Sequence, residues 1–350
     1  MASKAIGADL NQCLVDLRYL GHAVERLVKH EEMVRLLAPS TIWEPPSLLY
    51  TILTQPVKIW IRLLDLTFNS LRPWPKPLSP AIRVTSDIPE ADLLIHAGDL
   101  TNLGSAEEIQ AQIDWLNSLP HEHKVAIAGN HDRHLDPRSR GVLPLEDQQR
   151  LLNWKGIRYL QHSAVTLKFR GRRDLTIYGA PQTPASKRDD HAFRYPEGSD
   201  AWSDTLPRDI DILVTHSPPK YHLDLPAALG CEYLLGEVWH VQPTLHVFGH
   251  VHAGKSDLVG RLKGGTEVAR WDESQQSLER ALSRPDGFFR GLLDPRSWLD
   301  VSQIIFYGIS SILWEQVWGG QSPRPTFMVL ASLKYCDTDQ LRNPARVVEI

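Results

Sequence analysis

Cysteine is scarce in this chain, and the features of a secreted or membrane-spanning protein are also missing. The 350 residues include three cysteines, Cys13, Cys231 and Cys336, which lie far apart and outside any Cys-x-x-Cys spacing. A disulfide framework is therefore not expected, and a reducing compartment fits better. No run of about 18 uncharged apolar residues indicates a spanning helix, and the first residues lack the apolar stretch of a signal peptide. We predict a cytoplasmic protein.

A surplus of basic residues is also absent. The formal net charge is -4 and the isoelectric point is near 6.4, so the chain has no general field that attracts nucleic acid. Bulk nucleic-acid binding is therefore not expected. The composition is 42% hydrophobic and 23% charged, which is typical of globular domains with a real core and excludes a disordered chain.

The first 80 residues are predicted to be a helical region that ends in a linker. Apolar residues recur at three- and four-residue steps over residues 9–37. A second apolar stretch, residues 47–71, is interrupted by Pro56. Packing on the rest of the protein is favoured for it over a position on a membrane surface. The proline-rich residues 72–80 form a stiff linker, which places a domain boundary between 1–80 and 81–350.

From residue 81 onward, short apolar segments alternate with polar loops. Buried strands are predicted for IRVT, DLLIHAGD, KVAIAGN, LTIYGA, DILVTHS and TLHVFGH. Between two of them, SAEEIQAQIDWLNSL is a predicted helix with a capping box formed by Ser105 and Glu108. This alternation predicts a layered α/β fold with a sheet core. Ligands in such folds bind at the carboxyl ends of the strands.

A helical insertion is predicted at about residues 279–322. Residues 304–314, IIFYGISSILW, are apolar on nearly every side. Docking on the domain is the favoured interpretation, and a contact with a membrane surface or a partner protein is the alternative. After the insertion the chain returns to the strand-like TFMVLASL and ends on ARVVEI.

Four predicted strand ends carry side chains of the types that bind metal ions. They are Asp99 after the second strand, Asn130 to Asp132 after the third, His216 after DILVT, and His250 and His252 in GHVH. Each alone is more often a helix cap or a structural residue. Together, carboxylate, amide and imidazole donors suit divalent Mn, Fe, Zn or similar ions, and two ions bridged by a carboxylate can hold a phosphoryl group.

Glycines accompany these predicted ligands. Gly98, Gly129 and Gly249 each precede a predicted ligand or its neighbour, where a tight turn without a Cβ lets an ion and a phosphate approach. In an extended GHVH segment, His250 and His252 would point to the same side, so each could serve a different ion of a pair.

The blocks LIHAGDLT, AIAGNHD, VTHSPP and VFGHVHAG resemble the motifs of the calcineurin-like metallophosphoesterases. The chain is most similar to the branch of metallophosphoesterase-domain-containing proteins whose animal members act as cyclic-nucleotide phosphodiesterases. The resemblance covers about residues 81–278 and, more loosely, 323–350. It implies a two-sheet β-sandwich flanked by helices and, in the family, two divalent metal ions.

The resemblance also implies a role for each matching residue. Asp99 would bridge both ions, His252 would belong to the first, and three residues would complete the shell of the second ion: Asn130, His216 and His250. His131 would contact the phosphate and act as general acid toward the leaving oxygen. The attacking group would be a water activated by the ions. Asp132 would hold a neighbouring imidazole in place.

The family pattern begins with an Asp-any-His block just after the first strand, and this chain has SDIP there, with Asp87 as the only nearby carboxylate. Either SDIP is a degenerate motif, or a segment is absent. A parallel crossover needs about a dozen residues, whereas SDIPEA reaches roughly 20 Å when extended and must retrace a strand of about 17 Å. We favour a deletion, from a skipped exon or a faulty gene model, and predict that IRVT is displaced from its usual central place.

The predicted function is hydrolysis of phosphoester bonds by metal-activated water. With only Asp99 and His252 left for the first ion, we expect the chain as written to hold one ion well and to have feeble activity, and ordinary activity if the absent segment were restored. The alternative is a catalytically impaired one-metal protein that acts as a binding or regulatory protein. The expected substrate is a small phosphodiester or phosphomonoester. A cyclic nucleotide follows only by analogy with the branch that the chain resembles.

Overall fold

The computed structural model describes residues 38, 46–73, 91–185, 191–224, 229–252, 265–334 and 345–350. The predicted helix at 9–37, the predicted strand IRVT and the SDIP segment lie outside these ranges, as do Cys13 and Cys336. The predicted displacement of IRVT is therefore untested.

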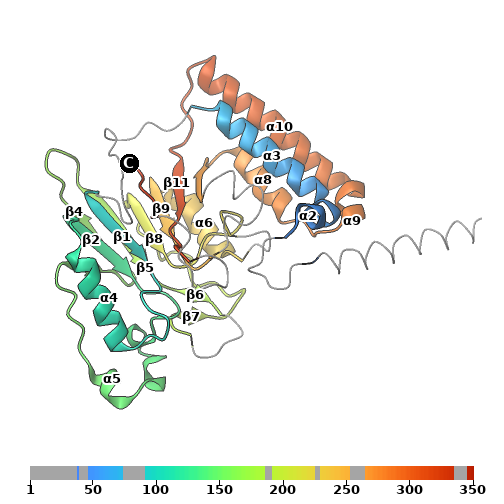
Figure 1. The fold of residues 1–350 in the computed structure, drawn as a ribbon. Coiled ribbons are helices and arrows are strands. Elements are labelled where there is room, and N and C mark those ends of the chain that lie inside the picture. The colour runs from blue at the N-terminus through green and yellow to red at the C-terminus, as the bar shows by residue number, and fades with distance from the viewer. Residues whose placement is uncertain are drawn as a thin grey trace, which may run out of the picture.

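The described part of the chain contains two main β-sheets (Figure 1). The smaller sheet is parallel, in the order β1 (Leu93–Ala97), β2 (His123–Ile127) and β3 (Ile157–Tyr159). The order of the larger sheet is β10 (Thr266–Ala269), β11 (Thr326–Leu330), β9 (Leu245–Phe248), β8 (Ile212–Thr215), β5 (Leu175–Ala180) and β4 (Ser163–Leu167). Its four inner strands are parallel, and β10 and β4 are antiparallel edges. This confirms the predicted α/β two-sheet fold.

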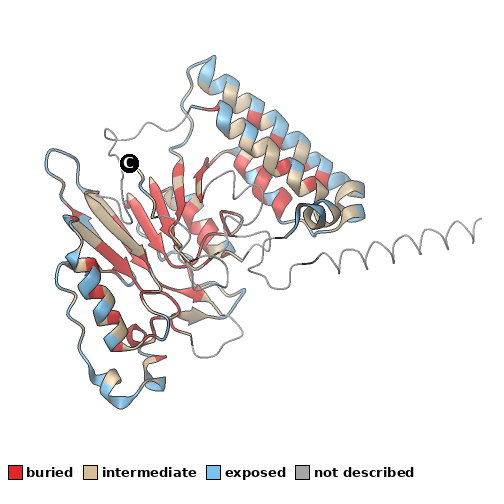
Figure 2. Cartoon of the chain, viewed as in Figure 1, coloured by how far each residue is buried: buried red, intermediate tan, exposed pale blue. Residues whose placement is uncertain are grey.

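Helices cover the outer faces of the two sheets, as the distribution of buried residues in Figure 2 shows. Ile127 of the smaller sheet and Ile177 and Val214 of the larger one meet in the core between the sheets. Helix α4 (Ala106–Ser118) packs Ile109 and Ile113 on the smaller sheet. Helix α6 (Glu232–Val241) covers the outer face of the larger sheet. The chain therefore forms layers in the order helix, sheet, sheet, helix.

The predicted capping box begins helix α4. The Ser105 hydroxyl accepts a hydrogen bond from the Glu108 amide at 3.2 Å, and the Glu108 carboxylate accepts one from the Ser105 amide at 3.2 Å. Smaller elements connect the layers: η1 (Arg133–Leu135), η2 (Arg140–Val142), α5 (Leu145–Gln149), β6 (Thr183–Pro184) and β7 (Arg194–Tyr195).

A separate helical layer combines the apolar stretch before the linker with the late insertion. It consists of α2 (Leu48–Thr54), α3 (Pro56–Leu71), α8 (Glu273–Leu282), α9 (Phe288–Leu293) and α10 (Pro295–Gln316). Pro56 separates α2 from α3 by occupying the first position of α3. Val57 and Ile61 of α3 pack with Leu278 of α8 and Ile304 of α10. The predicted packing of both segments on the protein is confirmed, whereas the domain boundary near residue 80 stays a prediction.

A buried cluster of ion pairs stabilises the packing of the helical layer. Arg72, at the end of α3, contacts Asp272 at 2.6 Å and also binds Glu315 of α10. Burial opposes the charge of Arg72, but the two carboxylates together raise the pKa of its guanidinium above the ordinary value. Of the helices in the described ranges, none is both long and apolar enough to cross a bilayer.

Candidate metal centre

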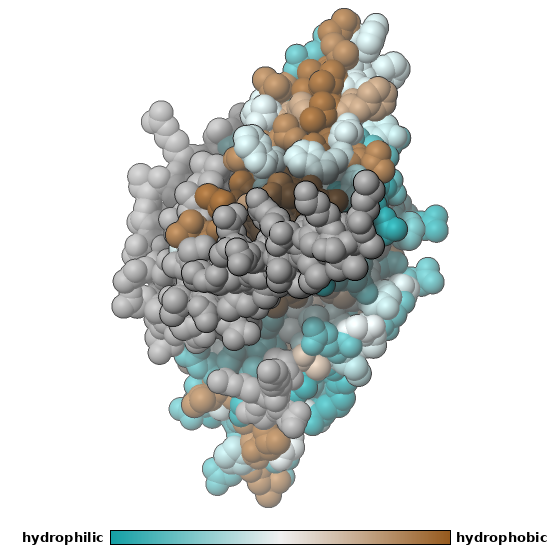
Figure 3. Space-filling view, turned by 90° about the vertical axis from the view of Figure 1, so that its right-hand side faces the viewer, coloured by the Kyte–Doolittle hydropathy of each residue, from teal (hydrophilic) through white to brown (hydrophobic). Residues whose placement is uncertain are grey.

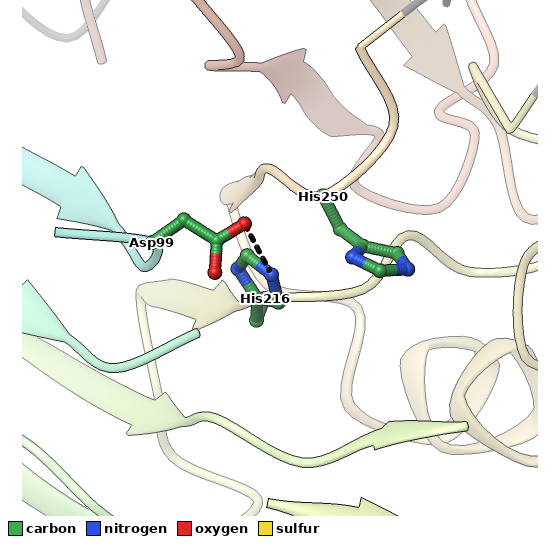
Figure 4. A group of neighbouring side chains, drawn as sticks. All are labelled: Asp99, His216 and His250. Atoms are coloured by element: carbon green, nitrogen blue, oxygen red, sulfur yellow. Dashed lines mark ion pairs between the residues drawn. The ribbon is translucent and has the colours of Figure 1, made fainter. Parts of the chain in front are cut away.

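The predicted site residues lie at the carboxyl ends of four strands. Asp99 follows β1, Asn130 and His131 follow β2, His216 follows β8, and His250 and His252 follow β9. Ligand atoms of Asp99, His216 and His250 all lie within 4.8 Å of one another (Figure 4). The structure therefore brings together three predicted ligands that are far apart in the sequence, while their metal-binding roles remain predictions.

The imidazole of His216 is the centre of this group. Its Nδ1 lies 2.8 Å from the carbonyl oxygen of Ala97. Its Nε2 lies 3.3 Å from Oδ2 of Asp99 and 2.9 Å from Oδ1 of Asn130. The ring is fully buried. One nitrogen and two oxygens from three strand ends therefore converge on one point.

These contacts fit a bound cation. When Nδ1 carries the hydrogen that it donates to Ala97, the neutral ring directs the Nε2 lone pair at two oxygen atoms. A proton or a metal ion removes this repulsion. Ligand atoms that bind one ion at about 2.0–2.2 Å lie roughly 3 Å apart, which matches the two distances from Nε2. Without an ion, burial opposes the charge of His216, but the charge and hydrogen bond of Asp99 raise its pKa.

Asp99 is held in a strained backbone conformation. Its φ of 54° lies in the left-handed region that residues other than glycine rarely adopt. Burial opposes ionisation, but the charge and hydrogen bond of His216, together with His131, lower the pKa of Asp99 well below its ordinary value. The carboxylate is therefore ionised and ready to bind a cation.

Two glycines allow the loops that carry these candidate ligands to approach one another closely, as the sequence predicted. Gly98 has a φ of 90°, and a Cβ there would lie 2.5 Å from Nδ1 of His216. At Gly129 a Cβ would lie 2.3 Å from Oδ1 of Asp99. A side chain at either position would push the ligands apart.

The conformation of the GHVH segment differs from the prediction. His250 has a φ of 61°, and the Val251 amide donates to the Gly249 carbonyl at 2.6 Å, which makes a three-residue turn around His250. The premise of an extended segment is therefore wrong. The turn places the His250 ring 5.0 Å from the His216 ring. Burial and then His216 lower the pKa of His250 to about 3, so the ring is neutral and can act as a ligand.

A cavity of about 1050 Å³ opens beside the group and extends along β1. Asp99, His131, His250 and His252 all line it. His252 borders the same cavity as Asp99, but it is not one of the three residues whose ligand atoms converge. The cavity provides space for a small ligand next to the candidate ligands.

His131 faces the same cavity. Its amide donates to Oδ1 of Asp99 at 3.0 Å. Its ring Nδ1 lies 3.0 Å from the carbonyl of Asn102, so Nδ1 carries a hydrogen and Nε2 is left for another partner. The ring is therefore oriented by the loop after β1.

Asp132 has a different role from the predicted one. It does not hold an imidazole, because its carboxylate accepts hydrogen bonds from the amides of Gly129, Leu100 and Thr101 at 2.7, 3.1 and 3.0 Å. Burial and the charge of Asp99 raise its pKa to about 6. Asp132 ties the loop after β2 to the loop after β1 and so positions the ligands indirectly.

Two further histidines were not identified from the sequence. The Nδ1 of His191 lies 3.3 Å from Nδ2 of Asn130, and its ring lies 5.1 Å from the ring of His131. His96 in β1 lines the cavity, and burial lowers its pKa to about 4. His191 follows no predicted strand end, so no local signal marks it, whereas His96 stands within the LIHAGDLT block.

Strand ends from two packed sheets that gather carboxylate, amide and imidazole ligands beside a cavity form an arrangement suited to metal-dependent hydrolysis. The model of the calcineurin-like phosphoesterase family matches residues 68–254, which is more than half of the chain. The protein belongs to this family of hydrolases, which use divalent metal ions. The predicted family membership is confirmed.

Two curated relatives show how far the similarity extends. "Probable rhamnogalacturonate lyase C" of Emericella nidulans is 41% identical over 196 residues, covering 55% of this chain and 17% of that protein. Human metallophosphoesterase domain-containing protein 1 is 37% identical over 190 residues, covering 48% of this chain and 56% of that protein. The chain thus spans about half of the human relative and a smaller part of the fungal one.

A solved structure is also similar over part of the fold. The crystal structure of TT1561 of Thermus thermophilus superposes with a TM-score of 0.32 and 16% identity, covering 55% of this chain and 75% of that chain. A superposition of this extent adds nothing to the assignment, which rests on the family match.

Proposed function

We propose that this protein hydrolyses phosphoester bonds with divalent metal ions bound at the carboxyl ends of β1, β2, β8 and β9. The observation that carries the proposal is the convergence of His216 Nε2 with oxygens of Asp99 and Asn130 at distances of 3.3 and 2.9 Å. A neutral imidazole would direct its lone pair at both oxygens, so positive charge is needed at this point, and a divalent ion bound by His216, Asp99 and Asn130 would supply it.

Four residues would hold one ion, and His252 would contribute to the binding of a second ion. Asp99, Asn130, His216 and His250 form the more complete set, and His252 borders the cavity next to Asp99. Divalent Mn, Fe or Zn suits this mixture of oxygen and nitrogen donors. Such ions polarise a phosphoryl oxygen and lower the pKa of bound water when they are present.

The protein's own residues would carry the proton transfer and the positioning. His131, with Nδ1 fixed by Asn102, offers Nε2 toward the cavity, where a protonated ring can give its hydrogen to the leaving oxygen. Asp132 keeps the two loops in register, so that Asp99 and His131 face the same phosphoryl group.

A second candidate function is supported by the absence of the Asp-any-His block. With SDIP in its place, the ligands that the resemblance assigns to the first ion are reduced to Asp99 and His252. A protein that holds one ion could polarise a phosphoryl oxygen but could not clamp both the attacking and the leaving oxygens. This second candidate is a one-metal binding or regulatory protein.

We propose a small phosphodiester or phosphomonoester as substrate, with a cyclic nucleotide as the first to test, and the cytoplasm as the compartment. The buried free thiol of Cys231 supports a reducing environment. The substrate proposal depends on the family and on the cavity that Asp99, His131 and His250 border.

Measurement of metal content together with turnover separates the two candidates. The purified chain is loaded with Mn²⁺, desalted and analysed for bound metal, and hydrolysis of bis(p-nitrophenyl) phosphate is followed in parallel. Two ions with turnover that Asp99→Asn abolishes support the enzyme. One ion without turnover supports the binding protein. A chain that retains no ion contradicts both candidates.

A further inference from the structure

Exposed apolar side chains are concentrated on the helical layer. Of the 21 large apolar side chains that are exposed in the described ranges, 15 lie on α2, α3, α9, α10 or directly after α10. They are Leu49, Ile52, Trp60, Leu71, Phe289, Leu293, Trp298, Leu299, Ile305, Phe306, Ile309, Leu313, Trp314, Val317 and Trp318. We call this surface the helical face. Figure 3 shows brown, apolar residues gathered over the helices at the top of the view.

Helix α10 makes the main contribution to the helical face. No charged residue occurs from Val301 to Trp314, and Phe306 and Trp314 are 65% and 52% exposed. Trp318, just beyond the helix, is 66% exposed, and Trp60 of α3 is 64% exposed. A monomeric protein in water rarely exposes so many large side chains on one surface, so this surface is expected to meet another phase or molecule.

Ion pairs on the buried side of α10 hold the helical face on the protein. Asp300, on the buried side of α10, binds Arg280 at 3.0 Å and Arg284 at 2.5 Å. The contacts of Arg72 with Asp272 and Glu315 fix the other end of the helix. Burial of the exposed aromatic residues would therefore cost little conformational entropy of the backbone.

Several polar groups on the exposed parts of these helices have hydrogen-bond partners within the protein. The hydroxyls of Thr67, Ser302 and Ser310 donate to the carbonyls of Leu63, Trp298 and Phe306 at 2.8, 2.8 and 2.7 Å. The carbonyl oxygen of the Gln303 side chain accepts from Arg280. These groups need no hydrogen bonds from the surroundings, which lowers the cost of placing the surrounding apolar side chains in hydrocarbon.

We propose that the helical face binds the surface of a lipid bilayer, with α10 lying in the interface plane. Non-obligate protein partners usually meet surfaces that are about as polar as the rest of the protein, whereas this one has an uncharged stripe edged by indoles. Tryptophan side chains are favoured at the boundary between lipid chains and water because one end is apolar and the other can hydrogen bond. The proposal is independent of the proposed hydrolase function.

The charges around the helical face predict the kind of lipid. Arg290 and Arg296 stand beside Asp286 and Asp294 in the sequence around α9, so the edge has no strong positive field. Binding should therefore depend on apolar burial and not on attraction to anionic headgroups. Vesicles of dioleoylphosphatidylcholine should suffice, and high salt should not release the protein.

Vesicle flotation with the full chain tests the proposal. The test variant is Phe306→Glu with Trp318→Glu. The matched control is Leu145→Glu with Leu151→Glu, which adds the same charge at residues that are 67% and 93% exposed on and after α5, outside the helical layer. The unmodified chain and the control should float with the vesicles, and the test variant should bind at least about tenfold less, because two large apolar side chains no longer enter the lipid.

Two further measurements are needed to interpret the flotation result. Thermal unfolding must show that both variants keep the stability of the unmodified chain, and otherwise Phe306→Ser with Trp318→Ser replaces the test variant. Quenching of tryptophan fluorescence by brominated lipid should accompany binding. Failure of the unmodified chain to float, or equal flotation of test variant and control, overturns the proposal. So does a dimer in solution that only the test variant dissociates, because the helical face would then join two copies.

Discussion

The backbone amide of His131 donates a hydrogen bond to Oδ1 of Asp99 at 3.0 Å. This bond joins the loop after β2 to the loop after β1 and leaves Oδ2 of Asp99 facing Nε2 of His216 at 3.3 Å. The proposed proton donor and the central carboxylate are thus fixed relative to each other by the backbone. Because the contact is made by the backbone amide of His131, replacing the His131 side chain should change catalysis without changing ion binding. Replacing the Asp99 carboxylate should change ion binding itself.

Asp99→Asn should remove most of the affinity for a divalent ion, because an amide supplies neither the negative charge nor the second acceptor oxygen. Titration calorimetry with Mn²⁺ measures the loss. Asp92→Asn is the control, since Asp92 is an exposed carboxylate that pairs with Arg172 at 2.8 Å, just before the strand that Asp99 follows. Equal affinity in Asp99→Asn and the unmodified chain would exclude Asp99 as a ligand.

His131→Ala should lower the turnover number by about 10²–10⁴-fold, the usual contribution of a general acid or base. Bound metal should stay unchanged, because the amide of residue 131 still holds Asp99. The loss should be smaller for a nitrophenyl ester than for an alkyl ester, since a nitrophenolate leaves without a proton. Rates with both ester types and metal content of the variant are the measurements. Loss of metal, or an equal fall for both esters, contradicts the assigned role.

Asp132→Ala should weaken ion binding by about 10–100-fold although Asp132 is not a predicted ligand, because the loop that carries Asp99 loses its anchor. It should also destabilise the fold by about 1–3 kcal/mol, since buried amides are left unsatisfied. Asp211→Ala is the control: Asp211 accepts from the amide of Thr176 at 2.8 Å, at the opposite end of β5 from the site. Calorimetry and urea unfolding of both variants should show a stability loss in each and an affinity loss only in Asp132→Ala.

His222 should make stability depend on pH in the alkaline range. Its Nδ1 lies 3.3 Å from Glu267 and its Nε2 lies 3.2 Å from Glu279. Burial opposes its charge, but the two carboxylates raise its pKa from 6.5 to about 10. Because the folded pKa is the higher one, the stabilisation is complete below about pH 6.5 and is lost as the pH rises through about 10.

His222→Gln should cost about 3–5 kcal/mol at neutral pH, because two buried carboxylates lose their partner. The difference from the unmodified chain should shrink toward about pH 10. Urea unfolding at several pH values measures it, with the exposed His240→Gln as control. A difference that stays constant over this range would show that His222 is not charged in the fold.

Local sequence patterns were sufficient for the strands of the core, since the predicted segments around β1, β2, β5, β8 and β9 are runs of buried apolar residues. Strand β4 was missed because most of its residues are exposed and its sequence SAVTL is not a continuous apolar run. Helix α8 begins at Glu273, earlier than predicted, because its buried residues include Gln275 and Glu279. Glu279 accepts a hydrogen bond from the indole of Trp239, 40 residues earlier in the chain, and such a distant partner leaves no pattern in the local sequence.

The site was predictable where a ligand follows a strand and not where it depends on backbone angles or distant contacts. Asp99, Asn130 and His216 meet because parallel strands of both packed sheets end on the same side of the protein. The turn around His250, the amide contacts of Asp132 and the position of His191 arise from loop conformation, which periodicity does not encode. The segment with SDIP lies outside the described residues, so sequencing the transcript across the codons for residues 80–95 is the direct test of the deletion hypothesis.

The ion cluster of Arg72, Asp272 and Glu315 constrains how this protein can be recombined with its relatives. The guanidinium lies 200 and 243 residues before the two carboxylates in the chain, and all three groups are nearly inaccessible to water. A chimera that inherits the insertion from one parent and the segment 48–72 from another could bring together carboxylates without their guanidinium. The two segments must therefore be exchanged as one cassette, and mutations in one should covary with those in the other.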